Sequence, residues 1–142
     1  MTLYAESSAV LSWLLGEDPA AAVRRCLASA KVVVASDLTL VECDRVIIRA
    51  VAHGELDEAE AAERRGQLTE AAAHWQLLRV SPEILDRARQ SFPHEPIRTL
   101  DALHLSSALS ARAAVPGLEL LSLDDRIRKT ARALGFRLQP AP

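Results

Sequence analysis

Two acidic residues follow short apolar runs that have the composition of buried strands. Glu6 comes directly after Thr2–Ala5, and Asp124 follows Leu118–Leu121 with Ser122 and Leu123 between them. If both runs are parallel strands, their carboxyl ends meet at one edge of a sheet, which is where open parallel sheets form ligand sites. The order of the residues therefore predicts that Glu6 and Asp124 lie together at that edge.

Two further acids fall on helical faces that are otherwise apolar. Asp101 shares its face with Leu105, and Glu42 shares its face with Val46, by the spacing of three or four residues that brings side chains together on a helix. A buried carboxylate is costly when ionised, so it is usually paired, protonated or bound to a metal. All four acids together favour one acidic site at the sheet edge.

Each acid also has an ordinary structural interpretation. Asp101 stands in a first helical turn, where the dipole favours a carboxylate by about 0.3–1 kcal/mol. Asp124 fits a helix N-cap, and Glu6 fits a solvated strand end. Glu42 fits an exposed helix residue paired with Arg45 or Arg49. It is the convergence of the four on one edge that favours a site over these alternatives.

The elements that must position these acids alternate between strand and helix. A glycine after the first helix and proline or serine caps mark several boundaries, with Asp18 and Pro19 expected as N-cap and first residue of the second helix. This alternation predicts an α/β fold with three α/β/α layers, a central parallel sheet and one domain over residues 1–142. We expect strands at Thr2–Ala5, Lys31–Ala35, Leu77–Val80, Leu118–Leu121 and Phe136–Leu138, and helices over 7–15, 19–29, 36–53, 57–75, 82–92, 100–113 and 124–134.

Charge and hydropathy narrow the class of protein. The chain of 142 residues has a formal net charge of −2, which argues against a general basic coat for nucleic acid but not against a local patch. Only Lys31 and Lys129 of its 17 basic residues are lysines; the arginines suit bidentate phosphate binding, or simply reflect codon usage. No basic leader or long apolar segment is present, so we expect a cytoplasmic protein without a membrane span. Cys26 and Cys43 are expected as buried free thiols.

The ordered motifs resemble those of the PIN-domain nucleases, and most closely the VapC toxins of bacterial toxin–antitoxin pairs. The resemblance is carried by four segments and covers essentially the whole chain. The third segment is the most specific of them. The segments are Tyr4–Ala9, Leu40–Glu42, Arg98–Leu105 and Leu121–Arg126.

This resemblance implies a metal-dependent ribonuclease whose matched acids hold Mg²⁺ or Mn²⁺. Mg²⁺ is bound by one or two direct carboxylates and keeps several waters, which other acids orient. Glu6 and Asp101 are then expected as direct ligands, with Glu42 and Asp124 binding through water or positioning the nucleophile. Glu6 departs from the family, in which this acid is usually aspartate. Its extra methylene would weaken Mg²⁺ binding, favour Mn²⁺ or abolish turnover.

Two residues beside the acids are candidates for substrate binding. Ser8 follows Glu6 and is expected either to hydrogen-bond a ligand or substrate phosphate or to cap a helix start. Arg98, on a loop with two prolines, is expected to contact phosphate or to form a surface salt bridge. His104, one turn after Asp101, is expected to be a packing residue, since sites of this kind prefer oxygen ligands.

The resemblance also implies RNA as substrate, a cognate VapB-like antitoxin and a homodimer. Residues 13–15 or the helix over 57–75 would contribute to the dimer. The alternative from another class is a catalytically weak or inactive PIN-fold binding module, which the glutamate at position 6 motivates. A metal-dependent phosphatase or DNA nuclease built on the same acids is a third hypothesis, because no residue reports on the 2′-hydroxyl.

Overall fold

The centre of the molecule is a five-stranded sheet in which all strands are parallel. A computed structural model describes all residues from 1 to 142. The strands are arranged in the order β3-β2-β1-β4-β5. Their bounds are β1 Thr2–Ala5, β2 Val32–Ser36, β3 Gln76–Leu78, β4 Glu119–Leu121 and β5 Leu138–Gln139. The parallel sheet is the one that the sequence predicts.

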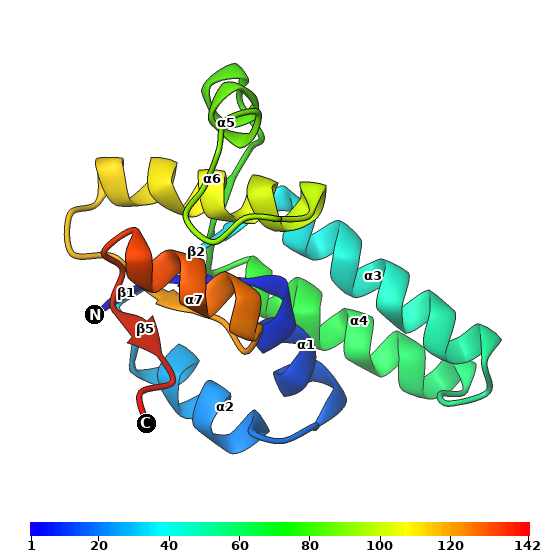
Figure 1. The fold of residues 1–142 in the computed structure, drawn as a ribbon. Helices are drawn as coiled ribbons and strands as arrows, with labels where there is room; N and C mark the ends of the chain where they lie inside the picture. Colours follow the sequence, from blue (N-terminus) through cyan, green and yellow to red (C-terminus); the bar gives the residue numbers. More distant parts are fainter.

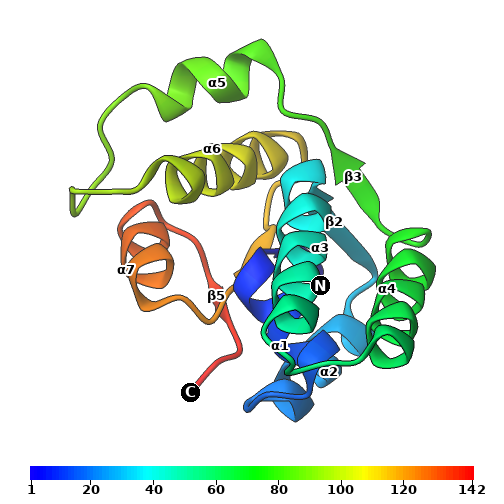
Figure 2. The same ribbon diagram turned by 90° about the vertical axis from the view of Figure 1, so that its right-hand side faces the viewer.

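Seven helices connect and cover the strands (Figure 1). The long helices α3 and α4 run side by side, and α5 lies outside α6, away from the sheet (Figure 2). The helix bounds are α1 Ser7–Leu15, α2 Ala20–Ser29, α3 Asp37–Ala52, α4 Glu58–Ala72, α5 Pro82–Ala88, α6 Thr99–Ala114 and α7 Asp125–Ala133. The chain thus has the three α/β/α layers expected from its alternating pattern.

Successive strand residues divide between two hydrophobic cores, one on each face of the sheet. Leu3 and Ala5 pack with α1, α2, α3 and α4, whereas Tyr4 packs with α6 and α7. This division follows from the two-residue period of a strand, whose side chains alternate between the faces. Both faces are apolar, and this accounts for strands that read as continuous apolar runs.

Local signals set most of the element boundaries. Ser36 and Ser81 cap α3 and α5 through their side chains, and Gly16 ends α1 with a φ of 68° in the left-handed region that glycine tolerates. The predicted cap at Asp18 is wrong: α2 begins after Pro19, which stands at the N-cap and forms no side-chain cap. A proline cannot supply the side-chain oxygen that a capping residue uses.

Several predicted ends were also displaced by a few residues. α4 ends at Ala72 rather than near residue 75, so β3 begins at Gln76, one residue before the predicted strand. α5 ends at Ala88, because its C-cap is Arg89 and a loop begins before Phe92. Helix and strand ends are fixed by capping and ladder contacts that periodicity alone does not reveal.

The two cysteines differ in burial. Cys43 is fully buried on α3, but Cys26 on α2 is only partly buried, so the expectation of two buried thiols holds for Cys43 alone. No helix has both the length and the apolar composition needed to span a bilayer.

Candidate active site

The carboxyl ends of β1 and β4 place Glu6 and Asp124 at the same edge of the sheet. Ala5 pairs with Leu121 in parallel register, and the Glu6 backbone N–H donates to the Leu121 carbonyl at 2.9 Å. Glu6 then caps α1, and Asp124 caps α7. The strand ends therefore bring these two acids to the edge that the sequence predicts.

Glu42, Asp101 and Asp124 line one open cavity of about 590 Å³. We call it the acidic cavity. It is formed by α3, the first turn of α6 and the start of α7, so three separate elements each contribute a carboxylate. The full set of lining residues is Glu42, Arg98, Leu100, Asp101, Asp124, Asp125 and Arg126. Glu6 is not among them.

Glu6 is buried behind this lining, with 4% of its surface exposed. Its Oε2 atom accepts hydrogen bonds from Ser122 Oγ at 2.8 Å, from the Ser8 backbone N–H at 3.2 Å and from Ser8 Oγ. Its Oε1 atom accepts none. Burial raises the pKa of the Glu6 carboxyl, and these hydrogen bonds oppose that rise only in part. The serines thus fix one oxygen and leave the other available to a ligand.

Two serines connect Glu6 with the chain around Asp124. Ser8 Oγ accepts from the Leu123 N–H at 2.9 Å, and Ser122 Oγ accepts from the Asp124 N–H at 3.2 Å. The helix start at α1 is capped by Glu6, so Ser8 is not the cap. Its hydroxyl instead hydrogen-bonds Glu6 within the protein.

Glu42 is held by an imidazole and a hydroxyl. His104, only 2% exposed, contacts Glu42 Oε1 through Nε2, and Ser7 Oγ donates to the same oxygen at 2.8 Å. Burial alone would raise the pKa of Glu42, but the hydrogen bond and charge of His104, with Ser7, lower it. Burial would lower the pKa of His104, and the contact with Glu42 and the charge of Glu6 outweigh burial and raise it. The pair therefore favours an ionised Glu42.

Asp101 has no hydrogen bond or ion pair with another side chain. Burial raises the pKa of its carboxyl, and the negative charge of Asp124 across the cavity raises it further. Asp124 uses one oxygen, Oδ1, to accept from the N–H groups of Arg126 and Ile127 at 2.9 and 3.1 Å. Asp124 is thus a helix cap and a cavity residue at once. Its second oxygen is free.

The donor set fits a hard divalent cation that keeps part of its water. The free oxygens belong to carboxylates, which Mg²⁺ and Mn²⁺ prefer, and the mutual repulsion of Asp101 and Asp124 would be relieved by a positive charge. No three acidic, imidazole or thiol groups are gathered closely enough to hold an ion by themselves. The arrangement suits one or two direct carboxylates with water completing the shell.

His104, Ser7 and Ser122 are site residues that the sequence did not identify. We expected His104 to be a packing residue; it is buried, but its Nε2 contacts a carboxylate. The signal was a single titratable residue one turn after Asp101 on an apolar helical face. Ser122 is fully buried two residues before Asp124, and its role depends on a partner far away in the sequence.

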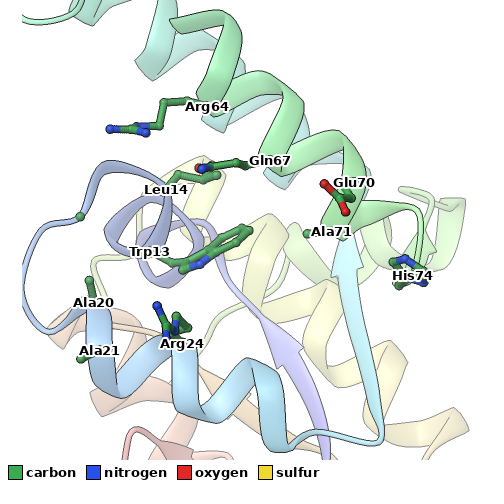
Figure 3. Close-up of a pocket in the computed structure, with 11 residues that line it drawn as sticks. Trp13, Leu14, Ala20, Ala21, Arg24, Arg64, Gln67, Glu70, Ala71 and His74 are labelled. Carbon is green, nitrogen blue, oxygen red and sulfur yellow. The ribbon is translucent and has the colours of Figure 1, made fainter. Parts of the chain in front are cut away.

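A second cavity, between α1, α2 and α4, contains none of the four acids. It measures about 680 Å³, and Trp13 lies inside it with Arg24 nearby and Gln67 above (Figure 3). Glu70 is its only carboxylate. Leu14, one of the residues expected to contribute to a dimer, is 2% exposed and belongs to the core. The lining of this second cavity therefore has no pair of carboxylates, whereas the lining of the acidic cavity has four carboxylates.

The chain matches a known protein family over nearly its whole length. The family model described as "PIN domain" matches residues 3–133. The chain is also 38% identical over 134 residues to a protein named Ribonuclease VapC46 from Mycobacterium tuberculosis, a match that spans 94% of this chain and 93% of that protein.

Two solved structures have a similar fold at low sequence identity. One is Mycobacterium tuberculosis VapC20, described as a sarcin-ricin loop cleaving toxin, with a TM-score of 0.66, 15% identity and coverage of 94% of this chain and 95% of that chain. The other is VapBC2 from Rickettsia felis, bound to a DNA fragment from its promoter, with a TM-score of 0.66, 9% identity and 98% coverage of both chains. These two likenesses concern the fold.

Proposed function

The chain belongs to the PIN domain family, and on this premise we propose that it is a divalent-metal-dependent endoribonuclease, the toxin of a VapBC-type pair. PIN-domain VapC ribonucleases depend on metal in general. The observation that carries the proposal is the acidic cavity, where Glu42, Asp101 and Asp124 meet at the edge of a parallel sheet, with the buried Glu6 linked to Asp124 through Ser122. The whole chain, 1–142, would be one such domain.

We assign the metal site to Glu6, Glu42, Asp101 and Asp124, with Mg²⁺ or Mn²⁺ as the ion. Asp101 would bind directly because no other group occupies its carboxylate, and Glu6 would reach the ion through Oε1. When bound, a divalent ion activates water and stabilises the leaving oxygen in phosphodiester hydrolysis. Glu6 has its Oε2 fixed by serines, which compensates for the freedom that a longer side chain brings.

Glu42 and Asp124 are assigned to orienting the attacking water. Glu42 stays ionised because His104 and Ser7 hold Oε1, and its other oxygen is free to accept a hydrogen bond from water. Asp124 is fixed through Oδ1 by backbone N–H groups and presents Oδ2. Such preorganised carboxylates hold a nucleophile without reorganising during reaction.

Arg98 is assigned to substrate phosphate. It is exposed, lines the acidic cavity next to Asp101 and forms no ion pair within 4.0 Å. A guanidinium binds two phosphate oxygens at once, which places the scissile group over the acids. Ser8 supports this geometry through its hydrogen bond to Glu6 and not by reaching the phosphate itself.

The partners proposed are an RNA substrate, a VapB-like antitoxin that inserts a segment beside the acids, and a second copy of the chain. A toxin–antitoxin complex from Klebsiella pneumoniae has the same fold over 87% of both chains, with a TM-score of 0.57 and 18% identity. The contrasting hypothesis, an inactive binding module, rests on Glu6 alone. The free Oε1 of Glu6 and the open cavity favour the enzyme.

Expression in a bacterial host tests the proposal. The unaltered chain should arrest growth, and Asp101→Asn should relieve the arrest because it removes a central ligand. Asp44→Asn is the matched control: Asp44 is an exposed acid on α3 that does not line the acidic cavity, so this variant should still arrest growth. Equal arrest by the Asp101→Asn protein would overturn the assignment of the acids.

A further inference from the structure

A smaller, basic hollow adjoins the acidic cavity, and it is distinct from the cavity between α1, α2 and α4. It measures about 300 Å³ and is lined by His94, Pro96, Arg126 and Lys129. Arg126 lines both this hollow and the acidic cavity, so the two are adjacent. The loop before α6 supplies one wall of the hollow, and α7 supplies the other. We call this hollow with Arg98 and Arg126 the cationic track.

The cations of the track form no ion pairs with neighbouring acids. Arg98, Arg126 and Lys129 are exposed, and none forms an ion pair within 4.0 Å even though Asp124 and Asp125 line the adjoining cavity. Free guanidinium and ammonium groups beside the acidic cavity provide local sites for anions, although the chain as a whole has a formal net charge of −2.

The loop that carries His94 and Arg98 is fixed to α7. The Glu95 carboxylate accepts hydrogen bonds from the backbone N–H groups of Phe92 at 2.8 Å and Ile97 at 2.6 Å, which closes the loop on itself. The buried Thr130 on α7 donates to the Pro93 carbonyl at 3.1 Å. The track is therefore preformed, and a ligand need not order it.

Arg126 and Lys129 stand one turn apart on α7. Residues at this spacing are neighbours on a helix surface, so the two cations extend the track away from the acids in one direction. Neither cavity is lined by Phe, Tyr or Trp, the residues on which bases mainly stack. The track thus has groups for phosphates and few for bases.

We propose that the cationic track binds the phosphate backbone of a single RNA strand on one side of the scissile phosphate. This inference rests on the proposed function, because it takes the acidic cavity as the place of cleavage. Arg98 and Arg126 contact the phosphates next to the acids, and Lys129 contacts one farther along the strand. Backbone contacts fix the register of the strand and add affinity without reading its sequence.

Lys129→Ala is the test variant, since Lys129 lines only the basic hollow and lies outside the acidic cavity. Arg25→Ala is the control: Arg25 is an exposed cation on a different helix, α2, and lines neither cavity. Both changes are made in an Asp101→Asn background, in which a labelled single-stranded RNA is not cleaved. Binding is measured by fluorescence anisotropy over a series of salt concentrations, with melting curves to verify folding.

Lys129→Ala should weaken RNA binding roughly threefold to tenfold and reduce the salt slope of the binding constant by about 0.7, the value for one phosphate contact on a single strand. Lys129→Arg should restore most of both. Arg25→Ala should change the slope far less. In the background with Asp101 intact, the cleavage defect of Lys129→Ala should fall mainly on KM.

Equal effects of Lys129→Ala and Arg25→Ala would overturn the proposal that the track binds RNA, because they would indicate an effect of general charge only. The two proposals fail separately. If the unaltered protein cleaves RNA but the Lys129 variant binds like the control, the track is wrong and the nuclease stands. If Lys129→Ala lowers RNA binding and its salt slope as stated while no cleavage occurs with any divalent ion, the track stands and the nuclease is wrong.

Discussion

His104 and Glu42, which are 62 positions apart in the sequence, meet inside the protein through Nε2 and Oε1. His104 is 2% exposed, and Ser7 donates to the same carboxylate oxygen at 2.8 Å. His104 and Ser7 thus both contact Oε1 of Glu42, and Oε2 remains available to other partners. This contact joins α6 to α3 and fixes the orientation of one acid of the cavity.

Removing the imidazole should loosen Glu42 and lower cleavage. We expect His104→Ala to reduce kcat roughly 10–100-fold, the range for residues that orient metal ligands. His104→Gln, whose amide N–H can replace Nε2, should recover part of the loss. Mn²⁺ affinity by calorimetry is the second readout, and it should fall in His104→Ala and recover in His104→Gln. Equal defects in the two variants would contradict a positioning role.

Glu6 should make the metal-free protein less stable as the pH rises. Its pKa is raised in the folded state, so the folded protein binds the proton more tightly than the unfolded chain does. Below the unfolded pKa of about 4.3, Glu6 is protonated in both states, and its contribution to the free energy of unfolding is fully present. As the pH rises from there through the folded pKa, this contribution is lost and the protein becomes less stable. With a chelator present, Glu6→Gln should remove this fall and be the more stable protein at neutral pH. The free energy of unfolding of both proteins is measured by urea unfolding across a pH series. If it changes with pH in the same way for the unaltered protein and for Glu6→Gln, the prediction is refuted.

Ser122 should contribute to stability as well as to the site. It is fully buried, donates to Glu6 Oε2 at 2.8 Å and accepts from the Asp124 N–H at 3.2 Å. Ser122→Ala leaves the buried Glu6 carboxylate and the half-buried Asp124 N–H with one bond fewer each, so the free energy of unfolding should fall by about 1–3 kcal/mol. Ser110→Ala on α6, which removes no hydrogen bond, is the control. A loss no larger than that of the control would mean that Glu6 finds other donors.

The two thiols should react at very different rates. Cys43 is fully buried, and burial followed by the charge of Glu42 raises the pKa of its thiol to about 12. Cys26 is only partly buried, so its thiol can be reached from solvent. Its partial burial also raises the pKa of this thiol. In the native protein a thiol reagent should label one cysteine, and Cys26→Ser should abolish that labelling. Cys43 should react only after unfolding, so rapid labelling of two thiols would be inconsistent with this core.

Strand ends and helical spacing were sufficient to predict much of this architecture. The alternating apolar runs predict the parallel sheet, because side chains buried on both faces must be apolar. The shared position of Glu6 and Asp124 is predicted by the direction of their strands. The role of Asp101 in the site is predicted by its charge on an otherwise apolar helical face. These are local properties of the chain, so they are visible in the sequence.

The contacts between distant residues were not predictable in the same way. The bond from Ser122 to Glu6 spans 116 positions, and the contact of His104 with Glu42 spans 62. Nothing in the spacing specifies which buried serine reaches which carboxylate oxygen. Nor does the pattern show that Glu6 lies behind the acidic cavity while the other three acids line it. The position of Glu6 depends on packing between β1, β4 and α1, which no single segment encodes.

The most direct test of the central claim is cleavage of a labelled single-stranded RNA by the purified protein, freed of metal with a chelator and then titrated with Mn²⁺ or Mg²⁺. Cleavage should be absent with the chelator and should return with the ion. Asp101→Asn should lower it by at least about 10²-fold, the scale expected for losing a group that stabilises developing charge, and Asp44→Asn should retain it. Cleavage that persists in the chelator, or that is unchanged in Asp101→Asn, would contradict the assignment of the acidic cavity as the metal-dependent active site.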